Sequence, residues 1–194
     1  VGSEMCIRDS WGDVLAQSHV SSGPAMADVL DKLMSLEIVQ KRAPINDPTN
    51  KRKSGYFVVD PLSLFYYRYV FRNASARQLL DPEVFYDRHV FQDFEENYVP
   101  HMFEEICRQY LVRQNRTGKI EPAFDAIGKY WYDDPANKTS GEFDVVTQDP
   151  EGYAFYEAKF RKSPITQKMV DEEIAQVEAT GLKCHRYGFF SRSG

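Results

Sequence analysis

Three charged residues, Asp144, Glu157 and Lys159, stand in an order that suits chemistry at a metal ion. Carboxylate oxygens are the ligands that hard divalent cations such as Mg²⁺ take in proteins. Two carboxylates held opposite each other on neighbouring strands destabilise the pair. A divalent cation between them would relieve that repulsion, and the ammonium of Lys159, on the same strand face as Glu157, would relieve part of it. The alternative is an exposed hairpin with three solvated charges.

The residues around this group predict a two-stranded hairpin. Two runs rich in β-branched and aromatic residues, 142–147 and 153–160, flank an Asp-Pro-Glu-Gly segment. Asp first, Pro second and Gly fourth are typical of a type I turn. A symmetric closure pairs residue 148 with residue 153. It sets Asp144 opposite Glu157, with Cβ atoms roughly 5 Å apart.

The Asp, the short loop and the Glu-x-Lys strand resemble the catalytic core of the PD-(D/E)XK nuclease superfamily. The resemblance implies that Asp144 and Glu157 bind a divalent metal, Mg²⁺ or else Mn²⁺. It also implies that Lys159 positions or activates the attacking water. The backbone carbonyl of Ala158 is a further candidate ligand. Phe143 replaces the Pro of the superfamily's "PD".

A second acid comes from the helix predicted from Pro100 to about residue 115. At about 100° per residue, Glu104 lies at the edge of the apolar face and Glu105 points to solvent. In the nuclease superfamily the helix before the sheet often supplies an acid to the metal site, which makes Glu104 the candidate. The alternative is an ion pair between Glu104 and Arg108, one turn later. The face expected to be buried consists of Phe103, Ile106, Cys107, Tyr110 and Leu111.

The element order agrees with this resemblance. A strand is predicted over 127–132, a loop over 133–140, then the hairpin. A helix over about 165–179 follows, opened by Ser163-Pro164, and a strand over 186–191 ends the pattern. We therefore expect an α+β fold with an αβββαβ core and a mixed sheet. Gln167 and Lys168, early in the second helix, are candidates to approach a nucleic-acid phosphate.

The first third of the chain predicts a winged helix-turn-helix over 11–72, connector helix included. A short helix over 11–17, a longer one over 25–37 and two strands, 38–42 and 56–59, follow one another. The loop between the strands is basic, and its cations could contact phosphates without reading sequence. The alternative is a solvated hairpin tip. The candidate DNA-binding residues are Lys41, Arg42, Lys51, Arg52 and Lys53.

A connector helix follows the wing. Asp60 and Pro61 suit its N-cap and first turn, and it is predicted to run to about Phe71. Aromatic residues surround it, so we expect it to be buried between two domains rather than to stack on bases. Residues 73–98 are interpreted as a linker or helical bridge, and 99–194 as the nuclease-like domain. Residues 1–10 are interpreted as an artefact or a tail, and the chain as truncated at its end.

Several motifs together resemble one family more closely. It is the C-terminal region of archaeal and bacterial P-loop ATPases of the AAA+ type, in which a winged helix precedes a domain of unknown function. The resemblance implies an N-terminal ATPase module outside this chain. No Walker A motif is present, so no ATP hydrolysis is assigned to the chain itself. The matching segments are DPLSLFYYRYVF, FEEICRQYL, IGKYW, GEFDVV and YEAKF.

Composition limits the function classes. The net charge is −5, so nucleic-acid binding must come from local patches. The three cysteines form no CxxC pair, which argues against a zinc site or a disulfide scaffold and makes the cytoplasm the default location. No apolar run approaches the length that spans a membrane.

The sequence thus predicts a metal-dependent DNA endonuclease domain joined to a DNA-binding winged helix. A catalytically inactive nuclease-fold module that binds DNA or regulates the ATPase is the alternative. A plain winged-helix regulator is a third reading, which ignores more than half of the chain.

Overall fold

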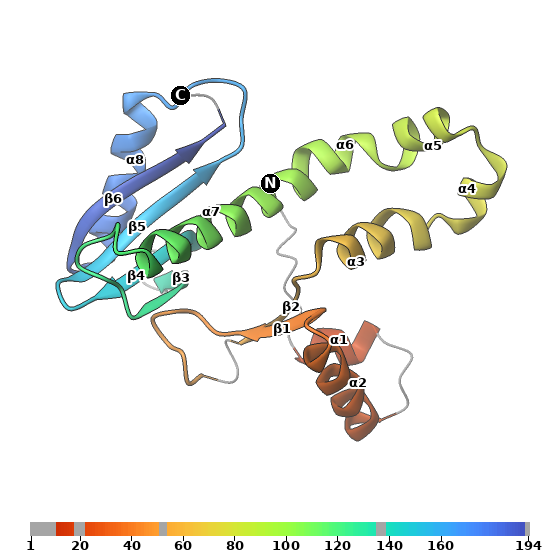
Figure 1. Ribbon diagram of the computed structural model, residues 1–194, viewed down its shortest axis with the longest axis horizontal. Helices are drawn as coiled ribbons and strands as arrows, with labels where there is room; N and C mark the ends of the chain where they lie inside the picture. The colour runs from red at the N-terminus through yellow and green to blue at the C-terminus, as the bar shows by residue number, and fades with distance from the viewer. Residues whose placement is uncertain (1–10, 18–21, 51–53, 135–138, 193–194) are drawn as a thin grey trace. The chain divides into compact units, whose positions relative to one another are not determined.

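The computed structural model describes residues 11–17, 22–50, 54–134 and 139–192 (Figure 1). The chain divides into two compact units. The first unit comprises residues 1–43 and 49–97, and the second comprises residues 44–48 and 98–194.

The first unit begins with two helices and a small antiparallel sheet, in the predicted order. Ser22 caps the second helix, its Oγ accepting a hydrogen bond from the N–H of Ala25 at 3.4 Å. Met26 and Leu30 form the buried side of that helix. The elements are α1 (Trp11–Gln17), α2 (Gly23–Ser35), β1 (Val39–Arg42) and β2 (Gly55–Val58), with β1 and β2 paired from Val39–Val58 to Arg42–Gly55.

The rest of the first unit is helical. Asp60 caps the first of these helices as predicted, accepting a hydrogen bond from the N–H of Ser63 at 2.6 Å. Several short helices then form two successive arms (Figure 1). They are α3 (Pro61–Phe65), the π-helix η1 (Tyr66–Phe71), α4 (Ala74–Leu79), α5 (Pro82–His89), α6 (Phe91–Asp93) and the π-helix η2 (Phe94–Tyr98). We call residues 61–97 the helical hairpin.

The predicted burial of the connector helix on all sides is wrong. Leu64 and Tyr69 are buried, but Tyr66, Tyr67 and Phe71 are exposed. The physical reason is that the second arm of the helical hairpin covers one face only.

A charged cluster joins the two arms. The guanidinium of Arg68 binds both carboxylate oxygens of Asp93, at 2.5 and 2.7 Å, and the hydroxyl of Tyr69 donates to the same carboxylate at 2.7 Å. The hydrogen bonds from Arg68 hold the pKa of Asp93 well below its usual range. Burial, together with the bond to Asp93, raises the pKa of the Tyr69 phenol. The ion pair therefore holds both arms at neutral pH.

The second unit is an α+β fold with a four-stranded mixed sheet. Its strands lie in the order β3-β4-β5-β6; the first two pairings are antiparallel and the last is parallel. The predicted order of helix, three strands, helix and strand is confirmed. The elements are α7 (Val99–Arg116), β3 (Ala126–Asp134), β4 (Thr139–Asp149), β5 (Gly152–Lys159), α8 (Gln167–Ala179) and β6 (Cys184–Ser191).

Two predicted boundaries in this unit are wrong. Thr166, not Ser163, caps α8, and its side chain accepts from the N–H of Met169. The predicted loop over 133–140 is shorter, because β3 continues to Asp134 and β4 begins at Thr139. Residues 135–138 lie outside the described part of the chain.

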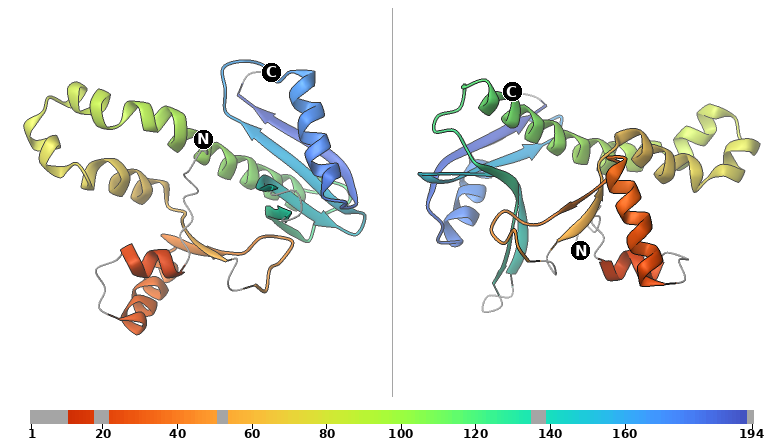
Figure 2. Two further views of the ribbon diagram at one scale, coloured as in Figure 1. Left: turned by 180° about the vertical axis from the view of Figure 1, so that it is seen from behind. Right: turned by 60° about the horizontal axis from the view of Figure 1, so that its bottom comes forward.

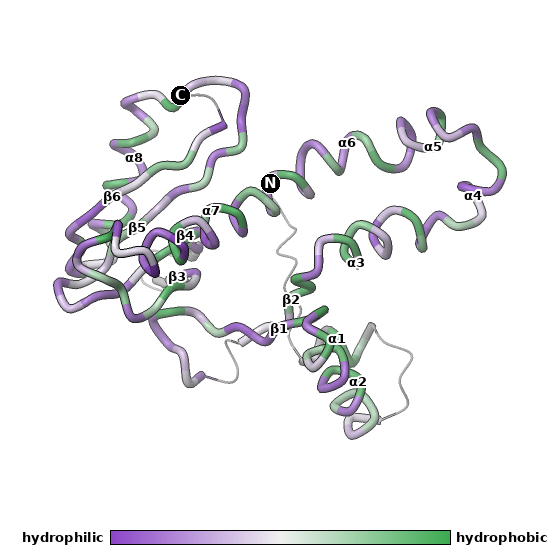
Figure 3. Tube along the Cα trace, in the orientation of Figure 1, coloured by the Kyte–Doolittle hydropathy of each residue, from purple (hydrophilic) through white to green (hydrophobic). Residues whose placement is uncertain are grey.

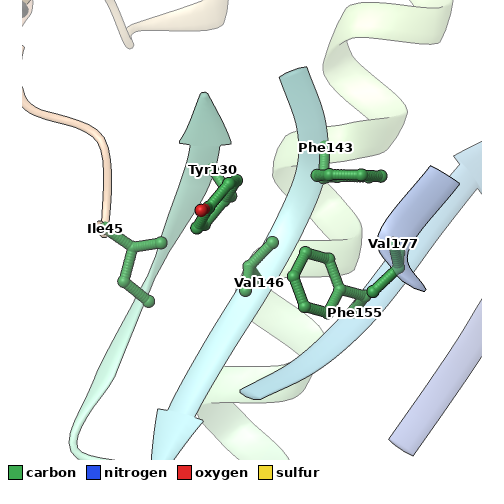
Figure 4. Close-up of a cluster of buried hydrophobic side chains, with 6 residues drawn as sticks. All are labelled: Ile45, Tyr130, Phe143, Val146, Phe155 and Val177. Carbon is green, nitrogen blue, oxygen red and sulfur yellow. The ribbon is translucent and has the colours of Figure 1, made fainter. Parts of the chain in front are cut away.

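Two apolar clusters pack the helices of this unit against the sheet. Figure 2 shows the sheet and its helices from two further sides, and Figure 4 shows one of the clusters. One joins Leu111 of α7 to Val145, Ala154 and Tyr156 of the sheet. The other joins Val177 of α8 to the side chains shown in Figure 4: Ile45, Tyr130, Phe143, Val146 and Phe155. The helices α7 and α8 therefore pack against the same sheet through different apolar clusters.

The predicted apolar face of α7 is partly wrong. Cys107 and Leu111 are buried as expected, but Ile106 is 60% exposed and Tyr110 is 51% exposed. The sheet covers a narrower stripe of the helix than the apolar residues span. Tyr110 nevertheless contacts the ring of Phe190 edge-on, at 5.8 Å between centroids.

A β-bulge interrupts the pairing of β3 with β4. Gly128 pairs with Val146 and Tyr130 pairs with Phe143, so two residues of β4, Asp144 and Val145, stand opposite the single residue Lys129. A bulge shifts the alternation of side chains along its strand and is common beside functional sites.

The turn between β4 and β5 closes as predicted. Gln148 pairs with Tyr153, and the carboxylate of Asp149 accepts hydrogen bonds from the N–H groups of Glu151 and Gly152, at 2.8 and 3.2 Å. Gly152 has φ +139°, and a Cβ atom there would collide with the backbone oxygen of Lys183. Only glycine fits this position without strain.

Replacing Gly152 by alanine should therefore lower the free energy of unfolding by roughly 2–4 kcal/mol, from backbone strain and the collision. Urea denaturation followed by circular dichroism measures it. The matched control is Gly23→Ala at the start of α2, where nothing lies within 4 Å; it should change stability by less than about 1 kcal/mol. Equal effects of the two substitutions would contradict this account of the turn.

Candidate functional site

The β4–β5 hairpin brings the two motif acids together. The regular pairing ends at Val145 and Tyr156, and Asp144 and Glu157 are the next residues on their strands. The N–H of Ala158 donates to Asp144 Oδ2 at 3.1 Å, so the Asp144 side chain reaches across to β5. The N–H and carbonyl of one strand residue point to the same side, which directs the Ala158 carbonyl toward β4 as well.

Lys159 lies in the same group. Its ammonium donates to Glu157 Oε1 and lies 3.4 Å from Glu173 Oε1. Glu173 comes from α8, so a residue of that helix joins the motif residues of β5.

A second lysine organises the α7 side. The ammonium of Lys129, on β3, lies 3.0 Å from Glu104 Oε2 and 2.8 Å from Glu142 Oε1. The alternative pairing of Glu104 with Arg108 is wrong. Arg108 binds Glu105 at 2.6 Å instead, so Glu105 is not the solvated residue that the sequence predicted. Glu105 lies three residues before Arg108, and at this spacing on a helix the guanidinium group reaches its carboxylate.

Glu104 Oε2 is buried and receives no well-directed hydrogen bond from the residues that the structure describes, although the Lys129 ammonium is near. A buried carboxylate oxygen without a hydrogen bond carries a desolvation cost.

Asp144 connects the two lysine-centred groups electrostatically. Its charge acts on Glu104 and Cys107 of α7, and also on Glu157 and Lys159 of β5. The bulge opposite Lys129 places it there. In all, five carboxylates and two ammonium groups share this site: Glu104, Glu142, Asp144, Glu157, Glu173, Lys129 and Lys159.

Burial and mutual repulsion shift the acids toward their protonated forms. Burial, assisted by Asp144, raises the pKa of Glu157 from 4.5 to about 7. Burial also raises the pKa of Glu104 to about 7, against the attraction of Lys129. Burial is also the main cause that raises the pKa of Asp144. Strongly perturbed acids gathered beside fixed charges are typical of functional sites.

The lysines respond in the opposite sense. Burial works to lower the pKa of Lys129, but Glu104 and Glu142 outweigh it and raise the pKa. The pKa of Lys159 is also raised, because its contact with Glu157 outweighs the effect of burial. Both lysines are therefore charged at neutral pH.

The donor set fits a hard divalent cation in chemistry. Among the described residues, no three His, Cys, Asp or Glu side chains converge as a metal-binding group. Mg²⁺ needs only one or two carboxylates, because waters and substrate phosphates complete its octahedron. Asp144 and Glu157, with the Ala158 carbonyl, form such a limited set. Glu104 is paired with Lys129 and interacts electrostatically with Asp144, so we do not count it among these ligands.

The remaining candidates make other contacts or lie outside the described residues. Gln167 and Lys168 are exposed at the start of α8, where Gln167 donates to Asp171 and Lys168 lies 3.6 Å from Glu172. On β1, Lys41 and Arg42 lie over the rings of Tyr56 and Phe57, at 5.4 and 5.7 Å. Lys51, Arg52 and Lys53 and the interpreted tail 1–10 lie outside the described residues.

Sequence reasoning missed three members of the site: Lys129, Glu142 and Glu173. Lys129 was the one charged residue in a strand predicted over 127–132, a signal of a partner inside the fold. Glu142 lies two residues before Asp144. Glu173 gave no signal, because an acid on an amphipathic helix is usually solvated.

The raised acid pKa values predict that stability falls as pH rises. The folded chain keeps protons on Glu104 and Glu157 up to about pH 7, whereas the unfolded chain releases them near 4.5. Their stabilising contribution is full below about pH 4.5 and is lost as pH rises through about 7. In EDTA, Glu157→Gln should remove on the order of 1–3 kcal/mol of the loss between pH 5 and pH 8.

Urea denaturation at several pH values measures this dependence. The matched control, Glu172→Gln, changes an exposed neighbour of Glu173 and should keep the wild-type dependence. If the Glu157→Gln variant loses stability as steeply as the wild type when pH rises, the pKa of Glu157 is not raised in the folded chain.

Two comparisons with known proteins gave a match. The model of the family DUF234, described as archaeal and bacterial proteins of unknown function, matches residues 66–176. An uncharacterised protein of Methanocaldococcus jannaschii is 27% identical over 103 residues, which cover 53% of this chain and 23% of that relative. No solved structure matches. Among the described residues, none of the helices is both long enough and apolar enough to cross a membrane.

Proposed function

Because the chain belongs to the DUF234 family, whose function is unknown, we propose a function from its site: the second unit is a nuclease-like domain that hydrolyses DNA phosphodiesters with a divalent metal. The observation that carries the proposal is the hairpin contact between Asp144 and Ala158, which sets an acid of β4 beside the Glu-x-Lys of β5. The order αβββαβ supports it, as does the mixed sheet.

Asp144 and Glu157 would hold the metal, Mg²⁺ or Mn²⁺, with the Ala158 carbonyl as a further oxygen ligand. When bound, such a metal polarises the scissile phosphate and lowers the pKa of a coordinated water. Five carboxylates against two ammonium groups leave the ionised site with a charge of −3, from the groups named above. A divalent cation reduces that charge and so binds favourably there.

The two lysines would hold the acids in place and offset negative charge. Lys159 already donates to Glu157, and a substrate phosphate would give its ammonium a second acceptor, so it would steady the charge that develops on that phosphate. Lys129 ties Glu104 to Glu142, which fixes the α7 acid beside Asp144. Glu104, with a pKa of about 7, can accept or release a proton at neutral pH.

The first unit would supply DNA contacts. Its helix–helix–hairpin order supports a winged helix, in which Lys41 and Arg42 would meet phosphates together with the wing residues Lys51, Arg52 and Lys53. In the second unit, Gln167 and Lys168 would approach the same backbone. An AAA+ ATPase module would act with this chain; this part of the proposal rests only on the resemblance of the sequence motifs.

Two observations favour a second candidate function, a nuclease-fold module that binds DNA without cutting it. Both site lysines are bound to carboxylates, and the described acids do not converge as a group of three. Such a module would regulate its ATPase. Metal-dependent cleavage separates the two functions.

Asp144→Asn should abolish metal binding, because it removes a central ligand while keeping the acceptor for the Ala158 N–H. Calorimetric titration with Mn²⁺ measures binding, and plasmid nicking on the same samples measures cleavage. We expect at least about a 100-fold loss of both. Glu172→Gln is the matched control and should retain both.

Three outcomes separate the candidate functions. Binding and nicking by the wild type alone support the nuclease. Binding without nicking supports the module that does not cut. Absence of binding at millimolar Mn²⁺ would refute the metal site.

DNA binding by the first unit has its own test. Lys41→Ala/Arg42→Ala should weaken duplex binding uniformly across sequences and reduce the salt dependence by about two phosphate contacts. Fluorescence anisotropy at several salt concentrations, without divalent metal, measures it. Asp144→Asn should leave this binding intact. Unchanged affinity and salt dependence in the double variant would exclude a role for β1 in DNA contact.

A further inference from the structure

Most of the large apolar side chains that are exposed among the described residues belong to the helical hairpin. Among the described residues, twelve large hydrophobic side chains are exposed, and eight of them belong to the helical hairpin: Leu62, Tyr66, Tyr67, Phe71, Leu79, Val84, Tyr86 and Phe91. Figure 3 shows hydrophobic stretches interspersed with hydrophilic ones along both arms. Exposed apolar side chains gathered in this way mark interaction surfaces, whereas scattered ones need no explanation.

Three of these rings form a cluster of their own. The centroids of Tyr66, Tyr67 and Phe71 lie 5.3–6.4 Å from one another. They lie on the π-helix η1, and π-helical turns are frequent at functional sites. The Arg68–Asp93 ion pair fixes this segment from its buried side. An exposed aromatic cluster on a fixed backbone is ready to bind a partner at low entropic cost.

The two arms carry opposite charge. Residues 61–80, the cationic arm, contain Arg68, Arg72 and Arg77 and no acidic residue. Residues 81–97, the acidic arm, contain six acids and one arginine, a net charge of −5. The exposed acids include Glu83 and Asp87, on successive turns of α5.

We propose that the helical hairpin is a self-association surface, on which the cationic arm of one chain binds the acidic arm of a second copy. Each arm offers apolar contacts of its own and a charge that matches the other arm. A two-fold axis would make the same contact twice, which is the property of a self-complementary interface. This proposal does not depend on the nuclease activity.

The exposed apolar area is of the right order. Eight large side chains, each exposing roughly 100 Å², approach the ~800 Å² per partner of a standard interface. Aromatic residues and arginine are also the types enriched in such interfaces. The opposite charges of the arms would set the register of the pair and make it salt-dependent.

Sedimentation velocity on the full chain between about 1 and 100 µM, without DNA or metal, tests the proposal. We expect a concentration-dependent species of twice the 22.5 kDa chain mass, weakened at high salt. Arg72→Glu/Arg77→Glu should shift the dimer dissociation constant upward by at least tenfold, and Glu83→Arg/Asp87→Arg should do the same. The four substitutions together exchange the signs at these four positions, so that opposite charges face each other there again, and they should restore the dimer.

Arg113→Glu/Arg116→Glu, on exposed positions of α7, is the matched control and should leave the dimer unchanged. Circular dichroism checks that each variant keeps its helices, and Phe71→Ser tests the apolar contact without a charge change.

A wild-type chain that stays monomeric at 100 µM would overturn the proposal. So would a dimer that none of the helical-hairpin variants weakens. A monomer whose Arg72 and Arg77 bind a single-stranded oligonucleotide instead would assign the surface to nucleic acid.

Discussion

The site depends on how β4 pairs with its two neighbours. On one side, the turn at Gly152 fixes the β4–β5 register and brings Asp144 next to Ala158. On the other side, the bulge sets Asp144 and Val145 against Lys129. Regular alternation would place the acid elsewhere, because side chains change face at every residue. The bulge keeps Val145 in the core while Asp144 faces the lysine that binds Glu104.

Electrostatics explains why this arrangement is tolerated. Five carboxylates in a partly buried cluster repel one another, and burial deprives each of water. Two lysines offset the cost, each bound to acids from different elements. Lys129 connects α7 to β4, and Lys159 connects β5 to α8. The same contacts that hold the charges therefore hold both helices on the sheet, so stability and site geometry share their determinants.

Local sequence patterns predicted much of this fold. The turn residues, the β-branched and aromatic runs of the hairpin and the cap at Asp60 act over a few residues, so they could be read directly. Lys129 and Glu173 could not be placed, since their partners lie far away in the sequence. The bulge leaves no local signal, because it arises from the pairing of β3 with β4. Periodicity also overestimated the burial of α7 and of the connector helix, because it gives the direction of an apolar face and not the area that covers it.

In the proposed function, Asp144 and Glu157 form one metal site with the Ala158 backbone. Nuclear magnetic resonance of the ¹⁵N-labelled chain tests it most directly, with trace Mn²⁺ as a paramagnetic probe. We expect the amide signals of Asp144, Glu157 and Ala158 to broaden first and excess Mg²⁺ to restore them. Broadening that begins elsewhere, for example at the Asp149–Gly152 turn, or that is absent at these three residues, would contradict it.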